Sequence, residues 1–197
     1  MNLQELDAYF YSLDRSFFLE GEMRTYAALD TPLPIGFGQT ISQPSLVLEM
    51  TKLLRPERDS RVLEIGTGSG FQTAILAGMS GKVYTVERIA ELMERAKGRL
   101  DLLGFTNICY KVGDGSLGWE EFAPYDRIMV TAAARVLPED LVRQLAAGGR
   151  MVIPVGPPDV QELQLVTKTA DGDLQIKTVS MVRFVELKGQ YGWEDDQ

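Results

Sequence analysis

The chain has 197 residues, of which 45% are hydrophobic and 24% are charged, a balance typical of a soluble globular protein. This length can bury a full α/β core, and the single cysteine, Cys109, excludes an internal disulfide. Because there is no histidine, Ser-His and Cys-His catalytic pairs and histidine metal ligands are also excluded. The net charge of −8 argues against sequence-independent binding of nucleic acid. No apolar run suits a membrane span or a signal peptide, so we expect a cytoplasmic protein without a nucleic-acid, membrane or metal partner.

The first 44 residues predict a helical cover followed by an exposed loop. Apolar residues recur weakly at helical spacing through residues 1–29, which predicts one or two helices packed on the core. Residues 30–44 combine prolines and glycines with apolar side chains, so we expect a surface loop that walls a binding cleft. The next pattern predicts an amphipathic helix over residues 46–54, with Ser42 at or near its N-cap. The local pattern alone therefore favours a capping role for Ser42.

A glycine-rich turn at residues 66–70 is the strongest local signal in the chain. An apolar run precedes it and a helical pattern follows it, which predicts a strand, a tight turn and a helix start. Such a turn lets the backbone approach a ligand, and the helix start offers unpaired N–H groups. Phe71 stands where the dinucleotide fingerprint needs a glycine, so a nicotinamide cofactor is disfavoured. We expect a different nucleoside-bearing cofactor, with a ligand-free turn as the alternative.

Two further strand ends carry acidic side chains. The apolar run 82–86 ends in Glu87, and the run 108–112 leads into Asp114, which has a glycine on each side. Because the carboxyl ends of parallel strands meet at one edge of a sheet, these groups should converge on the ligand of the glycine turn. A carboxylate at the end of the second strand can accept hydrogen bonds from both ribose hydroxyls.

The rest of the chain alternates strands with helices and then changes rhythm. We expect an α/β, Rossmann-like, doubly wound, mostly parallel seven-stranded sheet with a C-terminal antiparallel hairpin. A single domain should contain an N-terminal cover and cleft loop at 1–43, a cofactor-binding core at 44–156, and a hairpin and tail at 157–197. No heptad pattern indicates a partner, so we expect a monomer. The predicted elements after the glycine turn are helices at 71–79, 89–103 and 138–147, and strands at 127–130, 150–155, 161–168 and 174–187.

Several motifs together resemble the protein-L-isoaspartate O-methyltransferases, a family of class I S-adenosylmethionine-dependent enzymes, from about residue 12 to residue 187. The stretch 32–44 looks like the family's own signature, while the glycine turn resembles the first motif of class I methyltransferases in general. Glu186 stands where the family commonly has proline. The remaining matching motifs are VYTVER at 83–88, GDG at 113–115, TAA at 131–133 and GGRMVIPVG at 148–156.

The resemblance implies methyl transfer from S-adenosyl-L-methionine to the α-carboxylate of L-isoaspartyl residues in damaged proteins, a repair reaction that releases S-adenosyl-L-homocysteine. It implies that Ser42 and Thr40 act at the methyl group, that Glu87 holds the ribose, and that Asp114 meets the adenine. The other implied cofactor-binding residues are Glu64, Gly66, Thr67, Gly68, Ser69, Gly70, Arg88, Gly115 and Thr131.

A carboxylate nucleophile is ionised at neutral pH, so the implied reaction needs no histidine base.

Other functions are compatible with these motifs. A nucleic-acid adenine methyltransferase needs an Asn/Asp-Pro-Pro-aromatic motif where this chain has Thr131 and three alanines. The alternatives are an S-adenosylmethionine-dependent methyltransferase with another acceptor, and a non-catalytic S-adenosylmethionine-binding regulatory protein.

Overall fold

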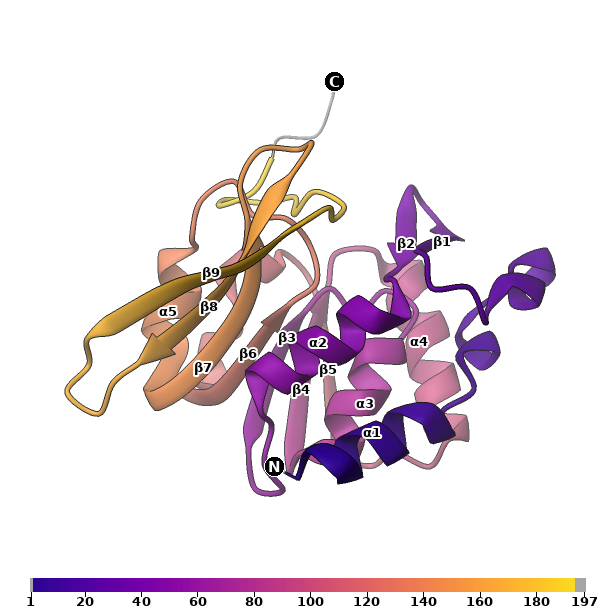
Figure 1. The fold of residues 1–197 in the computed structure, drawn as a ribbon, viewed down its shortest axis with the longest axis horizontal. Coiled ribbons are helices and arrows are strands. Elements are labelled where there is room, and N and C mark those ends of the chain that lie inside the picture. Colours follow the sequence, from indigo (N-terminus) through magenta and orange to yellow (C-terminus); the bar gives the residue numbers. More distant parts are fainter. Residues whose placement is uncertain (1, 194–197) are drawn as a thin grey trace.

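A seven-stranded sheet forms the centre of the computed structural model, which describes residues 2–193 (Figure 1). Its strands are β3 (Arg61–Ile65), β4 (Lys82–Glu87), β5 (Ile108–Val112), β6 (Tyr125–Val130), β7 (Leu145–Val155), β8 (Gln161–Lys168) and β9 (Leu174–Val182). They lie in the order β5-β4-β3-β6-β7-β8-β9, in which β3 to β7 run parallel and β8 and β9 run antiparallel. The predicted doubly wound, mostly parallel sheet with an antiparallel end is therefore confirmed.

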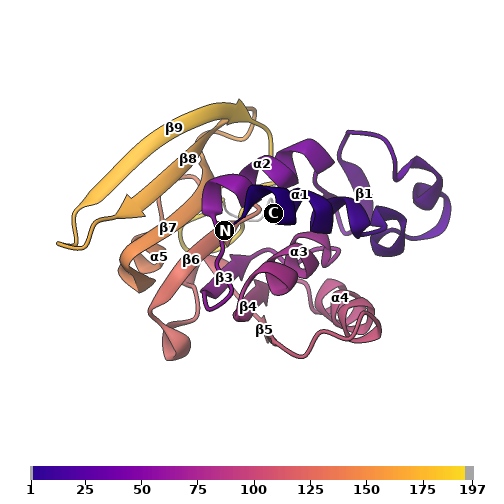
Figure 2. The ribbon, with the colours of Figure 1, turned by 60° about the horizontal axis from the view of Figure 1, so that its bottom comes forward.

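Three helices cover one face of the sheet, and Figure 2 shows them on the side away from α5 (Glu139–Gln144). Val62 of β3 packs there in one apolar cluster with Met50 and Leu76. None of the helices in residues 2–193 is both long and apolar enough to span a membrane. The covering helices are α2 (Pro44–Leu54), α3 (Phe71–Met79) and α4 (Ala90–Leu102), with α1 (Leu3–Ser12) packed outside α2 and α3.

The opposite face is covered by α5 and two short 3₁₀ turns, η3 (Gly115–Leu117) and η4 (Glu120–Phe122). Leu63, the neighbour of Val62, points to this face and belongs to a cluster with Leu141 and Trp119. Successive residues of a strand point to opposite faces, so an apolar run such as β3 is what a sheet buried on both faces requires.

The N-terminal segment covers the helical face, as expected, with α1 and two 3₁₀ turns, η1 (Arg15–Phe18) and η2 (Gly21–Tyr26). The expected loop that follows is in fact a short antiparallel hairpin, β1 (Leu33–Gly36) and β2 (Gln39–Ile41). Phe37 and Gly38 form its turn with φ of 55° and 69°. Two successive positive φ values are typical of the two-residue turn that joins the strands of a tight hairpin, so the segment forms paired strands and not an open loop.

The helix predicted over 138–147 is shorter in the structure, where α5 ends at Gln144 and β7 begins at the next residue. The Gln144 side chain accepts a hydrogen bond from the Trp119 N–H at 2.9 Å and donates one to the Leu117 carbonyl at 2.8 Å. These long-range contacts hold the residue where the helix ends, and no local pattern could show them.

The last strand is also shorter than predicted, because β9 ends at Val182 instead of residue 187. Val182 pairs with Gln161, the first residue of β8, so β8 offers no further partner. The chain then crosses the carboxyl end of β6, where the Ala133 N–H donates to the Val185 carbonyl at 2.7 Å and the Leu187 N–H donates to the Ala133 carbonyl at 2.8 Å. This crossing brings residues 184–188 beside the glycine turn.

Candidate functional site

The predicted strand, glycine turn and helix start are confirmed between β3 and α3. Gly66, Gly68 and Gly70 have φ of 93°, 52° and 89°, values that side-chain-bearing residues rarely adopt. A Cβ on Gly66 would lie 2.4 Å from Oγ1 of Thr131, and that hydroxyl donates to the Gly66 carbonyl at 2.7 Å. The turn therefore packs against the end of β6, and its residues Gly66 and Gly68 line a cleft.

Glu87 ends β4 and is 6% exposed. One carboxylate oxygen accepts the Gly68 N–H at 2.9 Å and the other accepts the Ile89 N–H at 3.0 Å. Each oxygen keeps a lone pair after these bonds, because a carboxylate accepts about four hydrogen bonds in all. Glu87 therefore links the glycine turn to the second strand and still has acceptor capacity toward the cleft that it lines.

Glu64 lies behind the turn and is fully buried. One of its oxygens contacts the hydroxyls of Thr73 at 2.6 Å and Thr85 at 2.7 Å. Burial raises the pKa of the Glu64 carboxyl to about 8, so the group is mostly neutral at pH 7. The Thr85 hydroxyl in turn lies 2.6 Å from that of Thr67, which does line the cleft. Glu64 therefore does not line the cleft, and it is linked to it only through the hydroxyls of Thr85 and Thr67.

Asp114 lies at the N-cap of η3 and is also set back from the cleft. One of its oxygens accepts the Ser116 N–H at 2.8 Å and the Ser116 hydroxyl at 2.7 Å, and the other accepts the Gln190 N–H at 2.9 Å. Its neighbour Gly115 does line the cleft. No local pattern indicated that the C-terminal tail would dock on this carboxylate.

Ser42 does not cap α2, so the interpretation based on the local pattern is wrong. The N-cap position is Gln43, without a side-chain cap, and the Ser45 N–H donates instead to the Asp30 carboxylate at 2.9 Å. Asp30 reaches the helix from a distant loop, which spacing within residues 42–46 could not indicate. Ser42 is half-buried and lines the cleft together with Thr40.

Arg15 is a residue that sequence reasoning missed. Its buried guanidinium donates to the carbonyls of Ala27, Leu29 and Thr31 at 3.0, 3.0 and 2.8 Å. It also donates to the Ser42 carbonyl at 3.1 Å. One side chain thus fixes the N-terminal cover to the segment that carries Ser42. No local pattern marked it, because Arg15 stands between the polar residues Asp14 and Ser16, as an exposed arginine also would.

These parts surround one cleft, here called the inner cleft. The predicted residues that do not line it are Glu64, Gly70 and Asp114. The predicted residues that line it are Thr40, Ser42, Gly66, Thr67, Gly68, Ser69, Glu87, Arg88, Gly115 and Thr131.

A second hollow, here called the side hollow, opens next to the inner cleft. Beyond the shared residues it is lined by residues of α2 and β9, among them Leu46 and Met181, and by Arg183. The two hollows meet at Thr40, Ser42, Thr131, Phe184 and Val185. The inner cleft and the side hollow therefore adjoin, with Ser42 at their junction.

No cluster of His, Cys, Asp or Glu within residues 2–193 could hold a metal ion. The donor set suits an organic cofactor with hydroxyl groups, since the buried Glu87 carboxylate and the glycine turn both line the cleft. The inner cleft is therefore lined by the Glu87 carboxylate and the glycine turn as well as by Thr40 and Ser42.

Comparison with known proteins supports this assignment. The family profile of protein-L-isoaspartate(D-aspartate) O-methyltransferase matches residues 3–192. The chain is 54% identical to a protein-L-isoaspartate O-methyltransferase of Dictyoglomus thermophilum, over 93% of this chain and 83% of that protein. It is 52% identical to one of Geobacter metallireducens, over 93% of this chain and 85% of that protein.

Solved structures agree. A protein-L-isoaspartate O-methyltransferase structure has a TM-score of 0.82 at 29% identity and covers 96% of this chain, while the chain spans 65% of that longer structure. A structure from Plasmodium falciparum, described as a candidate protein-L-isoaspartate O-methyltransferase in complex with S-adenosyl-L-homocysteine, has a TM-score of 0.76 at 26% identity. It covers 94% of this chain, which covers 96% of it. With a family profile that spans nearly its whole length, this chain belongs to the protein-L-isoaspartate(D-aspartate) O-methyltransferase family.

Proposed function

We propose that this protein transfers a methyl group from S-adenosyl-L-methionine to the α-carboxylate of L-isoaspartyl residues in damaged proteins. The observation that carries the proposal is the junction at Ser42, where the cleft that contains the glycine turn and Glu87 meets the side hollow. Membership of the protein-L-isoaspartate O-methyltransferase family supplies the acceptor and the cofactor.

Different residues of the inner cleft would bind different parts of the cofactor. Glu87 would accept the ribose hydroxyls with the lone pairs that its two backbone bonds leave over. Gly66 and Gly68 line the cleft and would lie against the methionine portion, which their backbone can approach closely because they carry no side chain. Gly115 would lie beside the adenine.

Three of the predicted cofactor residues would act from behind these. Gly70 packs closely against α4, since a Cβ added to it would lie 3.3 Å from that of Ala96, and so it positions the start of α3 after the binding turn. Glu64 would steady Thr67 through Thr85, and Asp114 would hold η3 and the tail in place. Their contribution would be to the shape of the cleft and not to direct contact.

The proposed reaction does not require the protein to transfer a proton. S-adenosyl-L-methionine supplies the methyl group on a sulfonium, a leaving group that needs no protonation. The isoaspartyl carboxylate is ionised at neutral pH, with an ordinary pKa of about 4, so no base has to activate it. An anion and a cation become a neutral ester and a neutral thioether, and no proton moves. This balance agrees with a chain that contains no histidine.

The protein's task is therefore to align the two reactants and to exclude water. Ser42 lies at the junction, and its hydroxyl would donate a hydrogen bond that aims the carboxylate, with Thr40 nearby. Arg15 would keep this hydroxyl in place through the Ser42 carbonyl. Alignment of this kind accounts for a large part of the rate gain in many bimolecular enzyme reactions.

We further infer that the protein acts as a cytoplasmic monomer that binds neither nucleic acid nor membranes. The net charge of −8 and the lone cysteine support this inference. Sedimentation at micromolar concentration should give one species near 21.9 kDa, and a dimer would contradict the monomer.

The decisive experiment uses labelled S-adenosyl-L-methionine and two synthetic peptides that differ only in an isoaspartyl or an aspartyl linkage. We expect label on the isoaspartyl peptide alone. Binding of S-adenosyl-L-homocysteine, seen as a raised melting temperature, checks the cofactor separately. Binding without transfer to either peptide would point to another acceptor or to a non-catalytic regulatory role.

A further inference from the structure

A third hollow lies between α1 and α2, and is here called the α1–α2 groove. Its wall is mostly apolar and includes Leu3, Phe10, Tyr11, Leu48 and Leu53. Two of these side chains are largely unpacked, since Tyr11 is 76% and Leu3 51% exposed. Exposed apolar side chains gathered in a concave surface are a common mark of a binding site.

The α1–α2 groove adjoins the proposed site of reaction through shared lining residues. It shares Ser45 and Glu49 with the side hollow, and the side hollow shares Thr40 and Ser42 with the inner cleft. Ser45 and Glu49 lie one turn apart on α2, and the Asp30 carboxylate and the Gln43 amide meet at Ser45, where Gln43 donates to the Ser45 hydroxyl at 3.0 Å. The three hollows therefore follow one another across the start of α2.

We propose that the α1–α2 groove is a second contact for the acceptor polypeptide and binds an apolar side chain at some distance from the isoaspartyl residue. The inference rests on the proposed function. An isoaspartyl residue inside a protein has chain on both sides, and that chain has to leave the junction at Ser42. One way out runs past Ser45 and Glu49, which line both the side hollow and the apolar α1–α2 groove.

Simple geometry sets the spacing. From Ser45 to Lys52 the helix advances about 10 Å, because each residue rises about 1.5 Å. An extended peptide covers about 3.3 Å per residue. An apolar side chain about three to six residues from the isoaspartyl residue would therefore reach the wall formed by Leu48 and Tyr11.

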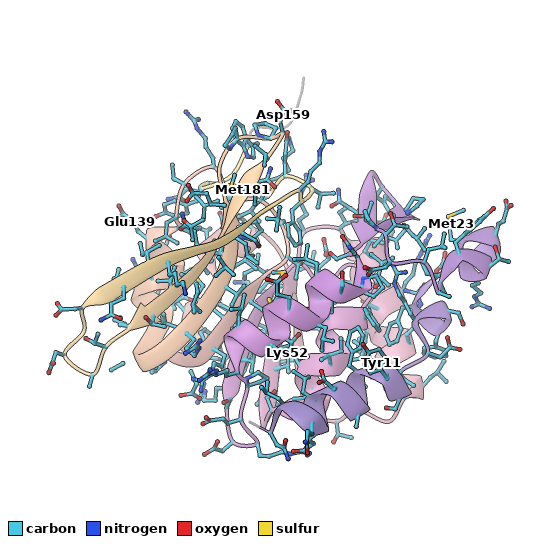
Figure 3. All side chains as sticks on the ribbon, in the orientation of Figure 1. Tyr11, Met23, Lys52, Glu139, Asp159 and Met181 are labelled. Atoms are coloured by element: carbon cyan, nitrogen blue, oxygen red, sulfur yellow. The ribbon has the colours of Figure 1, made fainter. Side chains whose placement is uncertain are left out.

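The chemistry of the groove favours an apolar occupant over a charged one. The charged residues that line the groove are two acids, Asp30 and Glu49, and two bases, Lys52 and Arg55. Their charges balance, so the groove does not favour a ligand of either charge. Lys52 also pairs with Asp7 at 2.6 Å. Figure 3 labels Tyr11 and Lys52 on this face, on α1 and α2.

Tyr11 has the features of an aromatic anchor. Its ring makes an edge contact with Phe10 at 5.3 Å between centroids, and the rest of it faces solvent. Exposed aromatic side chains that pack only on binding often contribute most of the affinity at an interface.

Three isoaspartyl peptides of equal length test the proposal. One has only small residues around the damaged residue, one has leucines about three to six residues before it, and one has them at the same distance after it. We expect at least one leucine peptide to have a KM about five- to twentyfold below that of the small-residue peptide, with kcat within about twofold, because burial of leucine adds affinity without touching the reacting atoms.

The double variant Leu3→Ser/Tyr11→Ser should lose this KM advantage, while the control Leu102→Ser should keep it. Leu102 is 81% exposed and lies on α4, so it matches the substitution without lying in the groove. Equal KM values for the three peptides, or an advantage that persists in the double variant, would overturn the proposal. Failure of the wild type to methylate even the small-residue peptide would instead reject the proposed function.

Discussion

The Arg15 guanidinium donates a hydrogen bond to the Ser42 carbonyl oxygen at 3.1 Å, across 27 residues of sequence. The same side chain holds three carbonyls of the N-terminal cover, so the cover and the segment of Ser42 form one unit. Asp30 supports that unit from the other side through the Ser45 N–H. The position of the proposed catalytic hydroxyl therefore depends on residues that touch neither cofactor nor acceptor.

Arg15→Lys should weaken this arrangement while keeping the charge. A lysine ammonium cannot reach four carbonyls spread around a planar guanidinium, and unsatisfied buried carbonyls cost about 1 to 3 kcal/mol. We expect a melting temperature several degrees lower and a kcat for the isoaspartyl peptide about tenfold lower. Arg24→Lys is the control, because Arg24 lies in the same cover and makes one carbonyl bond, to Leu19. Equal kcat in the two variants would remove Arg15 from catalysis.

Ser42→Ala should lower kcat for the isoaspartyl peptide about ten- to a hundredfold, the effect of losing one aiming hydrogen bond of about 1 to 3 kcal/mol. The affinity for S-adenosyl-L-homocysteine should stay near the wild-type value, since the ligands assigned to the cofactor lie on other segments. Initial rates and calorimetric titration separate the two effects. A variant with the wild-type kcat would show that the hydroxyl has no aiming role.

Glu87→Gln should weaken the binding of S-adenosyl-L-homocysteine about ten- to a hundredfold. The amide NH₂ would face either the Gly68 or the Ile89 N–H, so one of the two backbone bonds and part of the acceptor capacity would be lost. Titration calorimetry measures the change. Glu91→Gln is the matched control, because Glu91 is exposed on the first turn of α4. Unchanged affinity in Glu87→Gln would contradict the ribose assignment.

Glu64→Gln should reveal the neutral state of the buried carboxyl. The unfolded chain ionises a glutamate near pH 4.3, whereas the folded pKa is about 8. Between these values the folded protein holds a proton that the unfolded chain has released, so this group's contribution to stability is full at low pH and declines as the pH rises to about 8. The variant has no such proton to lose.

The melting temperature of Glu64→Gln should therefore gain on the wild type as the pH rises from about 5 to about 8, by roughly 10 °C in total, and then level off. Differential scanning fluorimetry across this range is sufficient, with Glu91→Gln expected to track the wild type. A difference between Glu64→Gln and wild type that does not change with pH would mean that Glu64 is ionised when folded.

Gly189→Ala should displace the C-terminal tail from η3. Its φ is 138°, and a Cβ there would lie 2.1 Å from the Asp114 carboxylate that holds the Gln190 N–H. Because Leu187 and Lys188 line the inner cleft, we expect affinity for S-adenosyl-L-homocysteine to fall roughly tenfold, or about 1.4 kcal/mol.

Gly172→Ala is the control for Gly189→Ala, because it introduces backbone strain without a steric clash. Its φ is also positive, at 93°, but in the turn between β8 and β9 no atom lies within 4 Å of the position that its Cβ would take. It should lose some stability and keep the wild-type affinity. Equal affinity losses in both variants would show that the tail does not shape the cleft.

The sequence by itself determined the features that are encoded within short stretches. Apolar runs at strand spacing and the glycines at 66, 68 and 70 specified the sheet and its first turn, because only glycine adopts such φ values freely. Glu87 could be found because a strand end is a local feature. The C-terminal antiparallel hairpin could be predicted for the same reason.

Only the tertiary structure decided how distant segments share their polar groups. Ser42 is released from a capping role by Asp30 and held by Arg15, and Glu64 is neutral because its surroundings bury it completely. Asp114 is turned toward the tail by Gln190. These outcomes depend on desolvation and on hydrogen bonds between residues far apart in the chain, quantities that exist only once the chain has folded and that no local pattern contains.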